Sequence, residues 1–213
     1  YRIAISFISI ENAKENLKNE EKHLTFEEYQ RETSKEWDKY LSAIKIKSKN
    51  EDRIKQFYTH FYHSLIHPNI VSDVNGEYMG ADFKVHKTKE NREQYSSFSV
   101  WDTYRTQGQL IAMLFPKKSS DMMQSLVDFA EQAGGYGRWI LANIETGIMQ
   151  GDPTPILISN SYAFGGDDFD LETAYSYMKK GALIPRLYSQ KQEIRPYLEE
   201  YINNGHTFAS MSL

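Results

Sequence analysis

The sequence contains no cysteine, which excludes a disulfide framework and a zinc site built on thiolates. No apolar run approaches the ~20 residues that a membrane-spanning helix needs; residues 110–115 form one of the longest. The formal net charge is −4, so the chain lacks the positive surplus typical of nucleic-acid binding. These absences argue against a membrane-spanning helix within this sequence and against a nucleic-acid partner, but they leave the cellular compartment open.

The remaining composition is that of a globular protein, with 40% hydrophobic and 25% charged residues in 213. This length suits one large domain, or a domain with a flanking piece. The 15 Tyr, 11 Phe and 3 Trp have two interpretations. They form a packed core with tyrosines at its edges, or they build a carbohydrate site in which aromatic faces pack against sugar C–H groups. Composition alone favours the core.

The first 67 residues predict one strand followed by helices. Apolar and small side chains alternate over residues 2–10, as in a strand, and its pairing partners are expected upstream because a lone strand is unstable. Residues 11–21 and 25–44 predict linker helices, the second opened by a capping box of Thr25 and Glu28. Residues 51–67 predict an amphipathic helix capped by Asn50. The start at Tyr1 and the abrupt end at Leu213 indicate a fragment of a longer protein.

The rest of the chain predicts further helices joined by short and medium loops. Asn75-Gly76 is a turn signal that could join two short strands. Helices are expected over residues 102–115, 120–133, 154–164, 171–180 and 190–203, with a left-handed cap at Gly134 and a side-chain cap at Asp170. Repeated helices with such loops favour an α/α architecture of antiparallel helix pairs.

The segment from Trp101 to Arg105 is the first candidate binding motif. In the structural interpretation, Asp102 caps a helix and pairs with Arg105, while Trp101 fixes the entry angle of the chain. In the functional interpretation, Trp101 offers a flat apolar face and Asp102 accepts hydrogen bonds from substrate hydroxyls, with Arg105 fixing the carboxylate. Local spacing alone favours the structural interpretation.

Asn143 and Glu145 form the second candidate motif, on a polar loop between two helical segments. In an extended segment, residues two apart point to the same side, so an amide and a carboxylate would face a pattern of sugar hydroxyls together. The alternative is that both satisfy backbone groups of the loop. Nearby, Asp152-Pro153 is a common helix opening, so Asp152 is expected to be structural. No metal site is predicted within the chain.

Several motifs together resemble glycoside hydrolase family 92, the α-mannosidases. The resemblance covers nearly the whole chain and is carried by residues 98–105 (FSVWDTYR), 122–126 (MMQSL), 137–139 (GRW), 142–153 (ANIETGIMQGDP) and 161–165 (SYAFG). It implies a mainly α fold. Residues 1–10 would be the last strand of an N-terminal β-sandwich, residues 11–48 linker helices, and residues 49–213 the first part of an (α/α)6 toroid.

The resemblance also implies an activity and a site. Members of this family are calcium-dependent, inverting exo-mannosidases, many specific for α-1,2 linkages, and inversion needs a general acid and a general base on opposite sugar faces. The family's acid, bases and most calcium ligands lie in later motifs with no counterpart here, so no catalytic residue is assigned and the isolated chain is expected to be inactive. The implied substrate-binding residues are Trp101, Asp102, Arg105, Asn143 and Glu145. Ile144 departs from the family, where a polar or small residue is common.

Two other functions stay open at this point. A non-catalytic helical domain that binds a glycan or a protein would keep these pocket residues without the acid and base. Another α/α toroid enzyme, such as a trehalase-like hydrolase or a polysaccharide lyase, is the third reading. The expected partners are mannose-containing glycans. Self-association through helix faces left exposed in a fragment is also expected.

Overall fold

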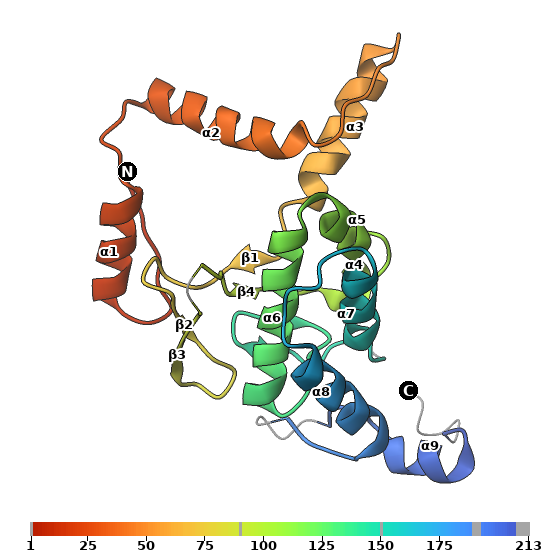
Figure 1. The fold of residues 1–213 in the computed structure, drawn as a ribbon. Coiled ribbons are helices and arrows are strands. Elements are labelled where there is room, and N and C mark those ends of the chain that lie inside the picture. Colours follow the sequence, from red (N-terminus) through yellow and green to blue (C-terminus); the bar gives the residue numbers. More distant parts are fainter. Residues whose placement is uncertain (1, 90, 150, 189–192, 208–213) are drawn as a thin grey trace. The chain divides into compact units, whose positions relative to one another are not determined.

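The computed structural model describes residues 2–89, 91–149, 151–188 and 193–207. It is mainly helical, with 50% helix and 9% strand, which confirms the predicted class. The chain divides into two compact units, Tyr1–His67 and Pro68–Leu213 (Figure 1). No helix in the described ranges is both long and apolar enough to cross a membrane.

The first unit consists of helices α1 (Ile10–Glu20), α2 (Phe26–Leu41) and α3 (Glu51–Ser64). The capping box is confirmed: Thr25 Oγ1 accepts from the Glu28 backbone N–H at 3.3 Å, and Glu28 Oε2 accepts from the Thr25 N–H at 2.8 Å. Asn50 caps α3 as predicted, accepting from the Arg53 N–H. Trp37 on α2 packs edge-to-face on a tyrosine of α3 with ring centroids 4.5 Å apart, so α2 and α3 are joined by aromatic contact.

The strand predicted over residues 2–10 is wrong for this structure. Residues 2–9 form no strand, and α1 begins at Ile10, where Ser9 Oγ accepts from the Asn12 N–H at 3.0 Å. A strand needs a neighbour to satisfy its backbone groups, and the described residues give this stretch none. The upstream β-sandwich therefore stays a prediction. The helix expected to reach residue 67 ends at Ser64.

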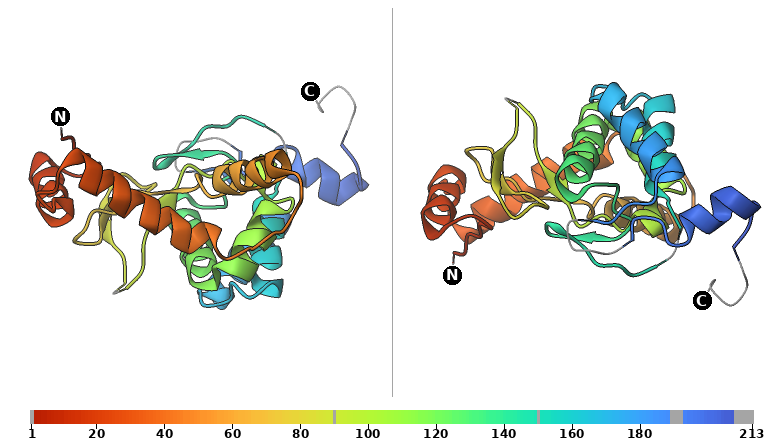
Figure 2. Two further views of the ribbon diagram at one scale, coloured as in Figure 1. Left: turned by 90° about the horizontal axis from the view of Figure 1, so that it is seen from above. Right: turned by 90° about the horizontal axis from the view of Figure 1, so that it is seen from below.

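The second unit is built around α6 (Pro116–Ala133), which contacts α5 (Gln107–Leu114), α7 (Thr154–Ala163), α8 (Leu171–Leu183) and strand β4 (Tyr95–Ser96). Figure 2 shows these helices gathered in one group. The buried face of α6 supplies the centre of the core, which comprises Met123, Leu126, Val127, Phe129, Ala130 and Ala133 of α6, with Phe98, Val100, Ile140, Leu157 and Ile158 among the residues packed against them. This core supports the segments that carry both candidate motifs.

The helix predicted over residues 102–115 is instead two helices. A short α4 (Val100–Thr103) and α5 are separated at Thr106, whose φ of 67° lies in the left-handed region and breaks the helical path. Pro116 then opens α6 at its first position, where a missing N–H costs nothing, so α6 begins four residues before the predicted start. The predicted left-handed cap at Gly134 is confirmed by a φ of 97°.

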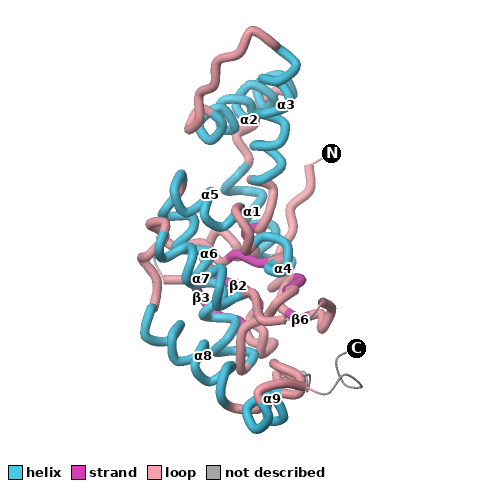
Figure 3. Tube along the Cα trace, turned by 90° about the vertical axis from the view of Figure 1, so that its right-hand side faces the viewer, coloured by secondary structure: helices cyan, strands magenta, loops and turns pink. Residues whose placement is uncertain are grey.

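The strands of the described residues form three antiparallel pairs, drawn in magenta in Figure 3. They are β1 (Asn69–Ile70) with β4 (Tyr95–Ser96), β2 (Glu77–Met79) with β3 (Val85–Lys87), and β5 (Ile140–Leu141) with β6 (Ile144–Glu145). The Gly76 N–H bonds to the Asp73 carbonyl in the predicted turn. The turn leads into β2 and does not join two paired strands, because β1 before it pairs with β4 and β2 after it pairs with β3. The β5–β6 hairpin was not predicted.

The C-terminal helices follow the prediction in part. Asp170 caps α8 by accepting from the Thr173 N–H at 2.9 Å, and α8 continues past Gly181 to Leu183. The predicted helix 190–203 starts among residues that lie outside the described ranges. Its described part is α9 (Leu198–Asn204).

Candidate functional site

The two candidate motifs lie side by side in the second unit, although about forty residues separate them. The Ile140 N–H donates to the Phe98 carbonyl at 3.0 Å, and Ser99 forms a β-bridge with Trp139. Before Ser99 along the chain, the Ser96 hydroxyl donates to the Ala142 carbonyl. Figure 3 accordingly shows β6 next to α4. The backbone just before α4 therefore runs along the β5–β6 hairpin.

Trp101 and Asp102 are presented to solvent by the first turn of α4. The side chain of Trp101 is 43% exposed, and Asp102 is also exposed. The Ser99 hydroxyl donates to the Asp102 carboxylate, so this carboxylate is oriented by the residue that precedes the helix. Both groups are thus available to a ligand.

Arg105 interacts with Tyr104, and the described contacts do not pair it with Asp102 as predicted. Its Nε donates to the Tyr104 hydroxyl at 2.8 Å, and its guanidinium carbon lies 5.2 Å from the centre of that ring. The predicted helix cap at Asp102 is also wrong, because Ser99 holds the cap position and Asp102 lies inside the helix. Arg105 is exposed, so its head group remains accessible.

Glu145 is buried at the base of the hairpin, with 2% of its surface exposed. One carboxylate oxygen accepts from the Arg138 N–H at 2.7 Å and the Trp139 N–H at 3.2 Å, and the other accepts from the Gly147 N–H at 2.9 Å. The carboxylate therefore collects backbone donors from both sides of the hairpin. Of the two alternatives left open by the sequence, these contacts match the satisfaction of loop backbone groups.

The close approach to Glu145 requires a glycine at position 137. A Cβ there would lie 2.5 Å from Ile140 Cγ1 and 2.8 Å from Glu145 Oε2, distances at which something must shift. The hairpin turn at Ala142 also uses a left-handed φ of 52°. Between Gly137 and Ala142, the backbone of Trp139 is held by Thr146. The Trp139 carbonyl accepts from the Thr146 N–H at 3.0 Å and from the Thr146 hydroxyl at 2.8 Å.

Asn143 lies in the turn of the hairpin and bonds in a different direction from Glu145. Its Nδ2 donates to the Gly80 carbonyl at 3.0 Å, which ties the hairpin to the β2–β3 connection. The expectation that Asn143 and Glu145 share one side assumed an extended segment, and the turn removes that assumption. Substrate contact by either residue stays a prediction.

Arg138 is a central residue of the site that sequence reasoning missed. It is 6% exposed, and its guanidinium donates to the Ile148 and Ile194 carbonyls, both at 3.4 Å. A charged residue between a glycine and an apolar run was the available signal. Arg138 ties the loop after the hairpin to the segment before α9.

Asp152 does not cap α7, contrary to the prediction. The helix begins at Thr154 behind Pro153, without a side-chain cap, and the Asp152 carboxylate lies 3.7 Å from the Arg195 guanidinium. Burial raises the pKa of Asp152, and the charges of Arg195 and Arg138 oppose that rise. Asp152 and Arg138 thus both contact the segment before α9, Asp152 through Arg195 and Arg138 through the Ile194 carbonyl.

One further polar group marks this region. The indole N–H of Trp139 is buried and has no hydrogen-bond partner among the described residues.

In the described ranges, no group of three His, Asp or Glu side chains is placed to hold a metal ion. The predicted calcium dependence, with most ligands outside this chain, stays a prediction.

The sequence profile of the glycosyl hydrolase family 92 catalytic domain matches residues 12–212. The chain belongs to this family. Comparison with curated proteins found no match. The resemblance carried by the motifs of residues 98–105 and 142–153 is thereby confirmed.

Solved structures give the same relationship. The family GH92 α-mannosidase BT3965 from Bacteroides thetaiotaomicron superposes with a TM-score of 0.81 at 26% identity, over 92% of this chain and 25% of that one. The GH92 family glycosyl hydrolase CcMan5 superposes with a TM-score of 0.65 at 28% identity, over 81% of this chain and 24% of that one. The inverting mannosidase BT2199 from B. thetaiotaomicron VPI-5482 shares the fold, with a TM-score of 0.84 at 23% identity, over 94% and 27%. The chain thus spans about a quarter of the length of the structures it matches.

Proposed function

We propose that this protein is part of an exo-α-mannosidase that removes terminal mannose from glycans. The observation that carries the proposal is the family match over residues 12–212, together with the likeness to BT3965 at 26% identity. A structure of BT3965 in complex with mannoimidazole matches equally well. Residues 49–213 are proposed to be the first part of an (α/α)6 toroid.

In this proposal the residues of the site divide into two roles. Trp101 and Asp102 are exposed and contact the terminal sugar, the ring packing on its C–H face and the carboxylate accepting from its hydroxyls. Glu145 is buried and acts through the backbone of the hairpin, which lies beside residues 98–99. Asn143 and Arg105 complete the predicted set.

The reaction itself is proposed to use groups outside this chain. An inverting hydrolysis requires one carboxylic acid at the leaving oxygen and one carboxylate that activates water. We assign neither to a residue of this chain. Calcium, when bound by the longer protein, would polarise sugar hydroxyls. The α-1,2 preference is likewise part of the proposal.

Binding by the chain tests the proposed site. Calorimetric titration with mannose should show saturable binding, and Asp102→Asn should weaken it roughly tenfold to a hundredfold, as expected for a hydrogen bond to a charged group. Asp38→Asn, an equivalent change on exposed α2, is the matched control and should bind as the wild type does. Equal affinity of the two variants would remove Asp102 from the site.

Turnover tests the proposed reaction. The 213-residue chain should release no mannose from α-1,2-mannobiose, whereas the longer gene product should do so with calcium and stop with a chelator. Mannose release by the chain alone would contradict the assignment of acid and base to other sequence. If the longer product binds mannose but never hydrolyses it, the alternative of a non-catalytic glycan-binding domain is correct.

A further inference from the structure

Ser99 holds the cap position of α4 but does not cap the helix with its side chain. Its carbonyl accepts from the Asp102 and Thr103 N–H groups at 3.0 and 3.1 Å. A serine hydroxyl at this position commonly accepts a hydrogen bond from a backbone N–H of the first turn, and α4 has no such bond. Helix capping therefore does not explain the hydroxyl of Ser99.

The hydroxyl of Ser99 donates to a side chain instead. Its acceptor is Oδ2 of Asp102, the exposed carboxylate of the candidate mannose site. A hydrogen bond to an ionised acceptor is stronger than one between neutral groups, so it holds the carboxylate in one orientation. Among the described residues, no donor is bonded to the other oxygen, Oδ1. One carboxylate oxygen is thus fixed and the other is left for a ligand.

The backbone of Ser99 is held by the β5–β6 hairpin and by the core. Ser99 forms a β-bridge with Trp139, whose N–H donates to the buried Glu145 carboxylate at 3.2 Å. Its neighbours along the chain, Phe98 and Val100, are both buried in the hydrophobic core. The donor is therefore attached to a part of the backbone that is fixed on both sides.

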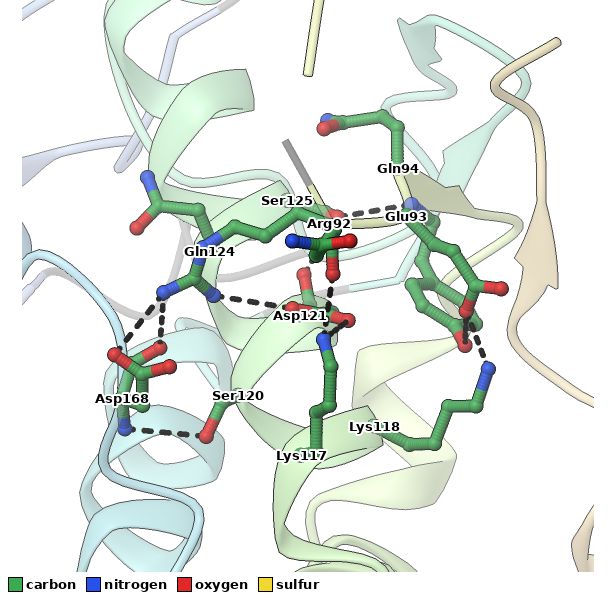
Figure 4. Close-up of polar contacts among 12 residues, drawn as sticks. Arg92, Glu93, Gln94, Lys117, Lys118, Ser120, Asp121, Gln124, Ser125 and Asp168 are labelled. Carbon is green, nitrogen blue, oxygen red and sulfur yellow. Dashed lines mark hydrogen bonds and ion pairs between the residues drawn. The ribbon is translucent and has the colours of Figure 1, made fainter. Parts of the chain in front are cut away.

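The segment that leads to Ser99 is also attached to α6. Figure 4 shows Arg92 reaching Asp121 on this helix, with Arg92 Nη1 3.0 Å from Asp121 Oδ1. Three residues later, the Tyr95 N–H donates to the Ser125 hydroxyl of the same helix at 2.8 Å. The chain from Arg92 to Ser99 is therefore held by α6 at its start and by the hairpin at its end.

We propose that Ser99 is a positioning residue of the candidate site, whose hydroxyl holds the Asp102 carboxylate in the orientation that accepts from the hydroxyls of mannose. A side chain that is already ordered loses less conformational freedom on binding, so it gives a higher affinity than a mobile one. Ser99 itself makes no contact with the sugar and acts only through Asp102. This inference rests on the proposed function, because it requires that Asp102 contacts the terminal sugar.

The test is titration of the 213-residue chain with mannose, followed by calorimetry and by NMR. Ser99→Ala should weaken binding roughly threefold to tenfold, the range expected for one hydrogen bond. Ser99→Thr keeps the hydroxyl and should restore the affinity to within about twofold of the wild type. The carboxyl-carbon resonance of Asp102, identified by its absence in Asp102→Asn, should move in Ser99→Ala and return in Ser99→Thr.

A double-mutant cycle shows whether Ser99 acts through Asp102. In the Asp102→Asn background the charged acceptor is gone, so adding Ser99→Ala should weaken binding by less than about twofold. Thr173→Val is the matched control, because Thr173 Oγ1 donates to Asp170 Oδ2 at 2.8 Å, also over three residues at the start of a helix. This control lies outside the candidate site and should bind mannose as the wild type does.

The possible failures are distinguishable. Wild-type affinity in Ser99→Ala, with weakened affinity in Asp102→Asn, would overturn this inference and leave the proposed function intact. Wild-type affinity in Asp102→Asn, or no saturable binding of mannose at all, would overturn the proposed site and this inference with it. A loss from Ser99→Ala that is equally large in the Asp102→Asn background would show that Ser99 acts on the helix and not on Asp102. Because Ser99 makes no side-chain cap bond, the urea midpoint of Ser99→Ala should stay close to that of the wild type.

Discussion

Glu145 offers the sharpest test of how the candidate site is built. Its carboxylate is 2% exposed and accepts three backbone N–H groups, from Arg138, Trp139 and Gly147. Glu145→Ala removes all three bonds and leaves the donors in a buried space. Glu145→Gln keeps the size of the side chain, but one of its two terminal atoms becomes a donor and faces another donor.

The magnitudes follow from this geometry. Hydrogen bonds to a charged group contribute about 1.5–3 kcal/mol each, but water entering the space left by alanine would recover part of the loss. We expect Glu145→Ala to cost about 3–5 kcal/mol and Glu145→Gln about 1–2 kcal/mol. Since a domain is stable by only about 5–15 kcal/mol, the alanine variant approaches unfolding and the glutamine variant is the more informative one.

The assay is urea unfolding together with amide hydrogen exchange. The midpoint should fall for both variants at an unchanged slope, and exchange should speed up at the amides of residues 138, 139 and 147. Glu131→Ala on α6 is the control, because Glu131 is exposed, and it should stay within about 0.5 kcal/mol of the wild type. A Glu145→Gln variant with wild-type stability and exchange but without mannose binding would refute the backbone role and make Glu145 a direct sugar ligand.

Further predictions concern two acids and two glycines. Burial is the main cause that raises the pKa of Asp128, so its charged form is disfavoured in the folded protein. Asp128→Asn should therefore raise the free energy of unfolding near neutral pH. This gain in stability should vanish as the pH falls below the pKa that Asp128 has in the unfolded chain. Hydrogen bonds from Thr173 lower the pKa of Asp170, so Asp170→Ala should cost about 1 kcal/mol of stability at neutral pH. The cost should shrink as acid protonates the wild-type carboxyl. Urea unfolding midpoints measured across pH check the direction of both the Asp128 and the Asp170 effects. Gly137→Ala should cost about 1–3 kcal/mol through overpacking. Gly181→Ala, inside α8 with nothing within 4 Å of the new Cβ, should add about 0.5–1 kcal/mol; equal effects of the two glycine changes in thermal unfolding would contradict the packing argument.

The sequence predicted best those features that depend on near neighbours. The capping box of Thr25 and Glu28, the caps at Asn50 and Asp170, and the left-handed end at Gly134 are all confirmed. Each is a contact within a few residues, so the local sequence contains both partners. The mainly helical class followed from the same local signals.

The features that failed depend on distant partners or on a single unusual torsion. The strand over residues 2–10 was assigned from alternation, but no neighbouring strand is present among the described residues. The helix breaks at Thr106, a residue other than glycine that adopts a left-handed φ. Nothing in the local sequence pattern predicts such a break. The hairpin that contains Asn143 is only four residues of strand, too short for periodicity to detect. Motif resemblance supplied the family where local pattern could not.

The contrast between local and distant contacts also separates the roles of the site residues. Trp101 and Asp102 were chosen as binding residues by resemblance, and their exposure leaves them able to meet a ligand. Glu145 was chosen with them, yet its contacts lie inside the loop that borders them. Because the Phe98 carbonyl and Ser99 are bonded to this hairpin, a disturbance at Glu145 should reach the start of α4 through the backbone. A weakened sugar affinity in Glu145→Gln is therefore expected only together with faster amide exchange in the hairpin, whereas Asp102→Asn should weaken affinity and leave that exchange unchanged.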